Sequence, residues 1–103
     1  MTNNTYIPHK WLVIDCDNDL YKVFAVWSGG YLDGDSWRVN SGIKNVEDMD
    51  DHYIIHGNSN SKYKCYKKNY GTNMYGTNLL SNIESTILSN TQTESLLKTF
   101  SKK

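Results

Sequence analysis

The pattern of apolar and polar positions predicts a β-rich first two thirds of the chain. Residues 10–16 (KWLVIDC) are nearly all apolar, as expected for a strand that is covered on both faces. Residues 20–27 (LYKVFAVW) resume this character after the polar residues 17–19 (DND), whose side chains favour tight turns. Residues 36–43 (SWRVNSGI) alternate and predict a half-buried strand, with one face formed by Trp37, Val39, Ser41 and Ile43.

Two more strands are predicted after an acidic connector at residues 45–51 (NVEDMDD). Residues 52–57 (HYIIHG) and 62–68 (KYKCYKK) are rich in β-branched and aromatic side chains, and the turn-forming residues 57–61 (GNSNS) join them. Short turns connect antiparallel neighbours. The sequence therefore predicts a roughly five-stranded antiparallel sheet over residues 10–68.

The hydrophobic period changes to a helical one after Asn78. We expect Thr77 or Asn78 to cap a helix, and residues 91–94 (TQTE) resemble a capping box for a short last helix. The apolar positions with helical spacing are Leu79, Leu80, Ile83, Ile87, Leu88, Leu96, Leu97 and Phe100. The prediction is an α+β fold in which one or two C-terminal helices pack on one face of the sheet.

The chain length of 103 residues fits one domain with one hydrophobic core. We expect residues 1–103 to form that domain, with flexible termini at residues 1–8 and 101–103. No apolar run reaches the length of a membrane span, and the first residues lack the pattern of a signal peptide. A cytoplasmic location is expected, so that Cys16 and Cys65 stay reduced.

The charges balance over the whole chain but not along it. Lys and Arg total 11, as do Asp and Glu, which argues against a globally cationic nucleic-acid binder and against a polyanionic mimic. Residues 1–60 have nine acidic and four basic side chains, whereas residues 61–103 have two and seven. The excess of Lys over Arg and the abundant Asn are typical of an AT-rich genome, which favours a small bacterial or viral open reading frame.

Two segments approach the sequence of a known catalytic or ion-binding loop, and both lack a required residue. Residues 71–76 (GTNMYG) have the glycine spacing of a phosphate-binding loop, but Thr77 and Asn78 follow where that loop needs Lys and Ser or Thr. Residues 15–19 (DCDND) begin like a calcium loop, but the glycine at its sixth position and the glutamate at its twelfth are missing. The sequence predicts a cap and a turn instead.

His52 and His56 have the spacing of a helical metal site, but they lie in a predicted strand. On a strand the two residues are about 13 Å apart, because each residue rises about 3.3 Å. Neither cysteine has a CxxC partner. We therefore expect no metal, no cofactor and no enzymatic activity, with Asp15, Cys16 and His52 as the first candidates if the chain were an enzyme.

Residues 62–70 (KYKCYKKNY) interleave cations and aromatic rings, as single-strand nucleic-acid platforms do. Strand alternation places Lys62, Lys64 and Tyr66 on one face. An edge strand protected from aggregation by its lysines has the same composition. The candidate nucleic-acid contacts are Lys62, Lys64, Tyr66, Lys67, Lys68 and Tyr70, followed by the glycine loop at residues 71–78.

Residues 27–37 (WSGGYLDGDSW) combine rigid aromatic rings with flexible glycines, a composition enriched in protein-binding surfaces. The alternative is that Trp27 and Trp37 close the core at the end of the sheet. The candidate partner-binding residues are Tyr31, Leu32, Asp33, Asp35, Trp37 and Arg38.

These observations favour a non-enzymatic protein-binding module. Its size and composition suggest a phage or mobile-element accessory protein that inhibits a host defence protein by direct binding, with no membrane partner. The alternative is a nucleic-acid or nucleotide binder that uses residues 62–70 and the glycine loop. The sequence leaves the partner and the oligomeric state open.

Overall fold

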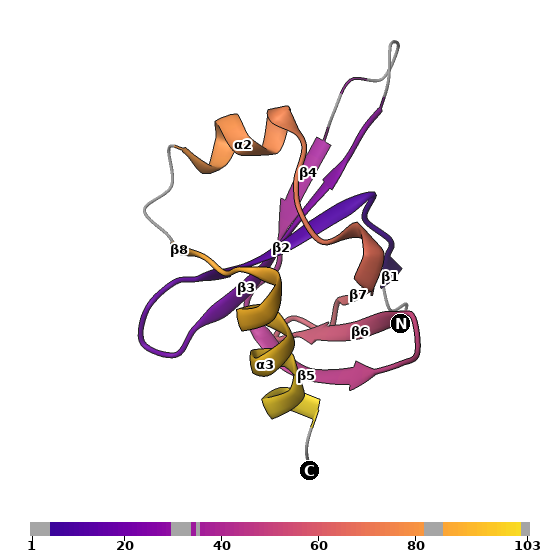
Figure 1. Cartoon of the computed structure of the whole chain (residues 1–103), viewed down its shortest axis with the longest axis vertical. Helices are drawn as coiled ribbons and strands as arrows, with labels where there is room; N and C mark the ends of the chain where they lie inside the picture. The colour runs from indigo at the N-terminus through magenta and orange to yellow at the C-terminus, as the bar shows by residue number, and fades with distance from the viewer. Residues whose placement is uncertain (1–4, 30–33, 35, 82–85, 102–103) are drawn as a thin grey trace.

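The computed structural model describes residues 5–29, 34, 36–81 and 86–101. In this part of the chain the strands form two four-stranded sheets (Figure 1). Sheet A has the order β1 (Thr5–Tyr6), β7 (Lys62–Tyr66), β6 (His52–Gly57) and β5 (Ile43–Asp48). Sheet B has the order β4 (Ser36–Val39), β3 (Tyr21–Trp27), β2 (Lys10–Asp15) and β8 (Thr86–Ile87). All neighbours are antiparallel except β1 and β7.

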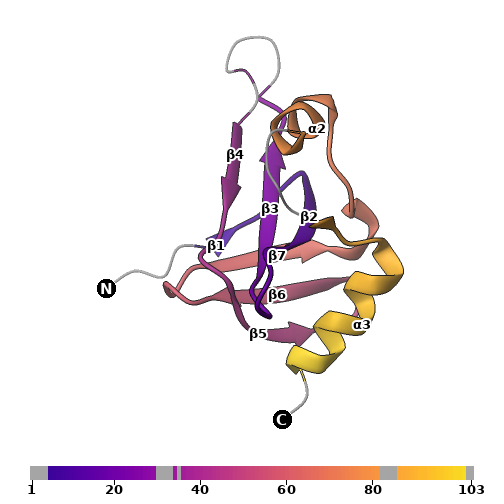
Figure 2. The same ribbon diagram turned by 90° about the vertical axis from the view of Figure 1, so that its left-hand side faces the viewer.

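The described helices are the short 3-10 helix η1 (Lys67–Asn69), α2 (Met74–Leu80) and α3 (Asn90–Ser101). The strands of sheet A run across those of sheet B, so that the sheets pack at a steep angle (Figures 1 and 2). Helix α3 lies beside β5, whereas α2 covers the other face of sheet B. The predicted α+β class with a C-terminal helix is confirmed.

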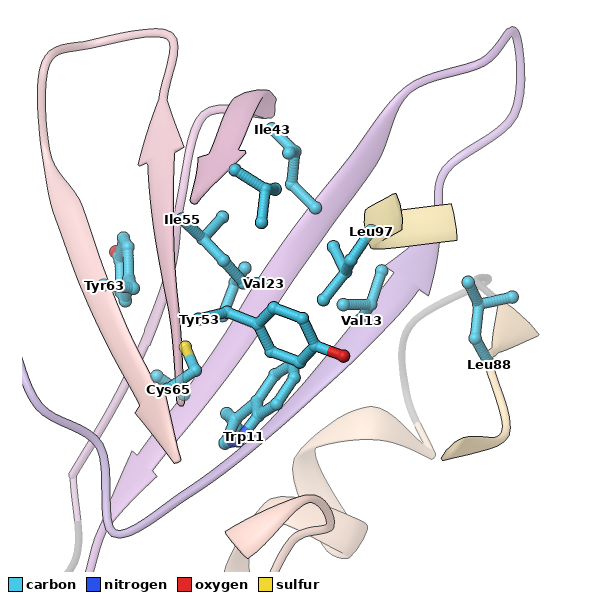
Figure 3. Close-up of a cluster of buried hydrophobic side chains, with 12 residues drawn as sticks. Trp11, Val13, Val23, Ile43, Tyr53, Ile55, Tyr63, Cys65, Leu88 and Leu97 are labelled. Carbon is cyan, nitrogen blue, oxygen red and sulfur yellow. The ribbon is translucent and has the colours of Figure 1, made fainter. Parts of the chain in front are cut away.

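The main core lies between the two sheets. Trp11 and Val23 from sheet B pack with Tyr53, Ile55 and Cys65 from sheet A (Figure 3). A second cluster joins α2 to the far face of sheet B through Leu12, Ile14, Phe24, Val26 and Leu80. Strands β2 and β3 are therefore buried on both faces, which explains why their sequences are continuously apolar.

The predicted strand at residues 36–43 is interrupted where the chain passes from sheet B to sheet A. Asn40 is buried, and its Oδ1 accepts hydrogen bonds from the backbone N–H groups of Val23 at 2.9 Å and Gly42 at 3.3 Å. Gly42 has φ of 132°, which side-chain-bearing residues rarely adopt. This crossing divides the predicted strands between two sheets.

Residues 45–51 were predicted to form an acidic connector, and this prediction is wrong for residues 45–48. Residues 45–48 belong to β5 and pair with β6, with a register irregularity between Ile43 and Asn45. Val46 enters the core, whereas Glu47 and Asp48 face solvent. The acidic composition of this segment did not indicate a strand, because only Val46 among residues 45–48 is buried in the core.

Helix α2 begins earlier than predicted. Asn73 is the N-cap, and its Oδ1 accepts a hydrogen bond from the backbone N–H of Gly76 at 2.8 Å, so that Thr77 and Asn78 lie inside the helix. A Cβ at Gly76 would overlap the Thr72 hydroxyl and would lie 3.1 Å from both Phe24 and Val26. Gly76 therefore allows the close approach of α2 to β3.

Ile87 was predicted to lie on the apolar side of a helix, and this prediction is wrong. Ile87 lies in β8, opposite Ile14 of β2, and α3 starts only at Asn90. Its capping box is Ser89 with Gln92: the Ser89 N–H donates to Gln92 Oε1 at 2.8 Å, and the Gln92 N–H donates to Ser89 Oγ at 3.1 Å. The pattern at residues 91–94 is not the cap, because α3 already begins at Asn90 and Thr91 lies inside the helix.

Three further expectations concern the chain ends and the cysteines. Residues 5–8, in the segment expected to be flexible, include β1 and the buried Pro8. Residues 1–4 and 102–103 lie outside the described residues. Cys16 and Cys65 form no disulfide; Cys65 is buried, and Cys16 is partly buried against the α2 cluster.

Candidate functional site

Trp37 is an exposed aromatic side chain with a fixed position. It is 45% exposed, and its ring stacks on that of Phe24, with centroids 5.9 Å apart and an interplanar angle of 27°. Phe24 is itself fully buried in the α2 cluster. The indole is thus supported by the core while much of it remains in contact with solvent.

Arg38 points to the opposite side of β4. Its guanidinium carbon lies 4.4 Å from the centre of the Tyr6 ring, a cation–π contact that joins β4 to β1. Arg38 is exposed despite this contact. The other predicted partner-binding residues, Tyr31, Leu32, Asp33 and Asp35, lie outside the described part of the chain.

Sheet B has exposed apolar side chains at both edges of the face that α2 covers. Trp37 and Val39 lie on this face in β4, and Ile87, which is 46% exposed, lies on it in β8. Met74, at the start of α2, is 80% exposed. The helix covers the middle of the face and leaves Trp37 accessible beside it.

A second candidate surface is the outer face of sheet A. The register places Lys62, Lys64 and Tyr66 of β7 opposite His56, Ile54 and His52 of β6, respectively. The Tyr66 and His52 rings are 5.8 Å apart, and Lys64 Nζ lies 5.2 Å from the centre of the Tyr66 ring. We call these six residues the lysine–histidine face.

The histidines of this face escaped prediction as binding residues. His52 and His56 were considered as ligands of a shared metal site, and His52 also as a catalytic candidate, although the alternation in residues 52–57 matches that in residues 62–66. The short hairpin turn fixes the register of the two strands, and this register places the histidines on the same face as Lys62, Lys64 and Tyr66. The structure thus extends the predicted Lys62, Lys64 and Tyr66 group by two imidazoles.

Carboxylates balance much of the charge near the lysine–histidine face. His52 Nδ1 lies 2.6 Å from Asp51 Oδ1, and His56 Nε2 lies 2.7 Å from Glu47 Oε2. The hydrogen bond with His52 lowers the pKa of Asp51. A pocket of about 270 Å³ at one end of the face has no carboxylate among its lining residues, which are Lys44, Asn45, His56, Gly57, Asn60 and Lys62.

The last three predicted nucleic-acid contacts do not belong to this face. Lys67 and Lys68 lie in η1, and Lys67 Nζ is bound to Asp48 Oδ1 at 2.8 Å. Tyr70 is a core residue: its hydroxyl donates to the Leu88 carbonyl oxygen at 2.7 Å and accepts from the Val13 N–H at 3.3 Å. The predicted group is divided because the strand ends at Tyr66.

The glycine loop positions α2. The Gly71 N–H donates to the Trp11 carbonyl oxygen at 2.7 Å, and Gly71 has φ of 141°. The Gly76 N–H is occupied by the Asn73 side chain and the Thr77 N–H by the Asn73 carbonyl oxygen. These two N–H groups at the start of α2 are therefore not free to bind a phosphate.

The first candidates for catalysis, Asp15, Cys16 and His52, make three different contacts. Asp15 is beside the β2–β3 turn, Cys16 packs against the α2 cluster, and His52 contacts Asp51. Residues 17–19 form the predicted turn between β2 and β3, all three with positive φ, and the Asp17 N–H donates to Asp15 Oδ1. Burial raises the pKa of the Cys65 thiol, which disfavours its nucleophilic form. Among the described residues, no three His, Cys, Asp or Glu side chains are placed to hold a metal ion.

Comparison with known proteins gives no relative from which a function could be transferred. No protein-family model, curated protein or solved structure matches the chain. None of the described helices has the length and apolar character needed to cross a membrane.

Proposed function

We propose that this chain is a non-enzymatic protein-binding module whose contact surface is centred on Trp37. The observation that carries the proposal is that Trp37 is 45% exposed yet stacked on the buried Phe24. Trp is among the residues most enriched in binding hot spots. An anchor held in place before binding loses little conformational entropy when a partner covers it.

The surroundings of Trp37 also support a protein partner. Val39 extends the apolar surface along β4, and Arg38 offers a guanidinium on the other side of the strand. Apolar anchors with Arg nearby are the usual composition of the centre of a protein interface. The role as a phage or mobile-element inhibitor of a host defence protein, acting in the cytoplasm, stays a prediction from composition.

The test is partner capture with matched variants. The tagged protein is used to retain proteins from a nuclease-treated lysate of its natural host, and the affinity of the purified partner is then measured. Trp37→Ala should weaken binding at least about tenfold, the scale of a hot-spot residue. Met49→Ala is the control, because Met49 is 44% exposed but lies between β5 and β6.

Either of two results would remove this proposal. One is that the host lysate yields no stoichiometric protein partner. The other is that Trp37→Ala binds the partner as tightly as Met49→Ala does, while the circular dichroism spectrum shows both variants folded.

The second candidate function is single-stranded nucleic-acid binding on the lysine–histidine face. Tyr66 and His52 offer adjacent rings for base stacking, with Lys62 and Lys64 on the same face. The pocket beside Lys62 and His56 has room for a backbone phosphate. The neighbouring carboxylates of Asp51 and Glu47 reduce the attraction for a polyanion, which is why this function ranks second.

Fluorescence anisotropy with a labelled oligothymidine and an oligouridine tests the second function. Binding should fall steeply with salt, and the Lys62→Ala/Lys64→Ala double variant should weaken it. Lys98→Ala, on α3, is the charge control. Absence of binding at low salt, or equal binding by the double variant and the control, would exclude this function.

A further inference from the structure

The edge strands of the two sheets differ in how they are protected. An edge strand exposes unpaired backbone groups, and proteins usually shorten such strands or cover them. Strands β1 and β8 have two residues each, and β5 lies beside α3 (Figure 1). Strand β4 is a four-residue edge, and none of the three described helices lies along it (Figure 2).

The register shows which backbone groups of β4 point away from β3. The Asn40 N–H donates to the Val23 carbonyl oxygen, so the backbone of Asn40 faces β3. Alternate residues of an antiparallel strand face the same neighbour. Arg38 therefore pairs with Ala25 of β3, whereas the N–H and C=O groups of Trp37 and Val39 point outwards.

Side chains and backbone thus present one recognition surface. Trp37 and Val39 have outward backbone groups, and their side chains lie on the apolar face of sheet B that α2 partly covers. Arg38 lies between them on the opposite face. An added strand would find hydrogen-bonding partners, an apolar row and one cation in alternation.

We propose that β4 is a β-augmentation site that takes one extended segment of a partner protein into sheet B. The segment pairs its backbone with Trp37 and Val39, places an apolar side chain against Trp37 and an acidic side chain opposite Arg38. This inference rests on the proposed protein-binding function and specifies how binding occurs.

A second copy of this chain fits the edge less well. When two β4 strands pair antiparallel so that Trp37 of each meets Val39 of the other, all outward groups of these residues are used. That register places Arg38 opposite Arg38, and like charges directly opposite destabilise a strand pair. A segment of a different protein that carries an acidic residue opposite Arg38 complements the charge of this edge.

The probe is a linear 12-residue peptide selected from a random display library on the intact protein. Amide hydrogen exchange, measured by NMR with and without the selected peptide, should slow at least about tenfold at Trp37 and Val39. The amide of Arg38 already pairs with β3 and should change little. Selected peptides should share an acidic residue next to an apolar one.

A backbone variant separates strand pairing from side-chain contact. Among backbone groups, Val39→Pro removes one outward N–H and none that pairs with β3, a position where proline is compatible with an edge strand. We expect Val39→Pro to bind the peptide at least about tenfold more weakly than Val39→Ala, which loses similar packing but keeps the N–H.

The possible results distinguish this inference from the proposed function. Failure to select any peptide, protection elsewhere, or equal binding by the two Val39 variants would overturn strand addition. If Trp37→Ala still abolished capture of the host partner, the proposed protein-binding function would be retained and only strand addition to β4 would be rejected. A dimer in sedimentation that Val39→Pro dissociates would assign β4 to a second copy and overturn the proposed occupant.

Discussion

Single side chains join segments that are far apart in the sequence, and Tyr70 is the main example. Its hydroxyl contacts the Val13 N–H of β2, the Leu88 carbonyl oxygen before α3, and Thr93 Oγ1 within α3 at 2.6 Å. Its ring meets Trp11 edge-on, with centroids 4.8 Å apart. Burial raises the pKa of Tyr70, which keeps the hydroxyl protonated.

Tyr70→Phe should therefore destabilise the protein while leaving the ring contact intact. Because it leaves the buried partners of the hydroxyl unpaired, we expect a loss of about 1–3 kcal/mol in the free energy of unfolding. Urea unfolding followed by Trp fluorescence measures this loss. Tyr75→Phe, in α2, is the control, and equal stability of the two variants would contradict the role of the network.

The two cysteines should differ in reactivity. Cys65 is fully buried and its thiol pKa is raised by burial, whereas Cys16 is partly exposed after β2. We expect a thiol reagent such as iodoacetamide to modify Cys16 in the native protein and Cys65 only after unfolding. Peptide mass mapping over time measures this, and rapid native labelling of Cys65 would contradict the described core.

At the scale of secondary-structure elements, local signals decide where strands and helices begin and end. The Ser89 and Gln92 side chains cap the N-terminus of α3 reciprocally. The sequence offers a similar pattern two residues later, beginning at Thr91. In the structure α3 begins at Asn90, so Thr91 lies within the first turn, and the Thr93 side chain is buried and contacts the Tyr70 hydroxyl.

Ser89→Ala and Thr91→Ala test which cap operates. Loss of a Ser N-cap costs about 1 kcal/mol, so Ser89→Ala should lower the free energy of unfolding by that amount. Thr91→Ala should change it by less than about 0.5 kcal/mol, as exposed substitutions usually do. Urea denaturation monitored at 222 nm gives both values, and the reverse order would place the helix start at Thr91.

The strands were more predictable than the connections between them. The predictions at residues 10–16, 20–27, 52–57 and 62–68 each contain a strand, because burial leaves a direct apolar pattern. The passage between sheets depends on the buried Asn40 amide, which composition does not reveal. The helical spacing of apolar residues wrongly assigned Ile87 to a helix, because a strand of two residues is too short to show a period of its own.

The candidate site was predictable in its chemistry but not in its geometry. Alternation correctly placed Trp37 and Val39 on one face. It also grouped them with Ile43, which lies in the other sheet. The exposure of Trp37 follows from the edge position of β4, and strand order is a property of the whole fold.

At the scale of the whole molecule, the core between the sheets is built around the aromatic rings of Trp11, Tyr53 and Tyr63. Burial raises the pKa of Tyr63 to about 12, and burial also raises the pKa of Tyr53. A phenol with an ordinary pKa of about 10 in the unfolded chain favours unfolding once the pH exceeds that value. These groups therefore stabilise the fold below pH 10 and progressively cease to do so above it.

We expect the ionisation of Tyr63 to leave the urea midpoint unchanged up to about pH 10 and to lower it as the pH rises towards 12. Tyr63→Phe should be less stable at neutral pH but lose less stability between pH 10 and 12. Absorbance at 295 nm reports phenolate formation in parallel. An identical pH dependence in Tyr63→Phe would show that Tyr63 does not couple to unfolding.

The sheet order also determines when the protein can fold during its synthesis. Thr5 pairs with Lys62, and Ile14 pairs with Ile87, so the first strands find their partners only across long stretches of chain. On the ribosome, β2 and β3 can form their hairpin early. One apolar face of this hairpin stays uncovered until β6 and β7 have emerged, and the other until α2 has emerged. We therefore expect the nascent chain to be a substrate for chaperones that bind exposed apolar strands.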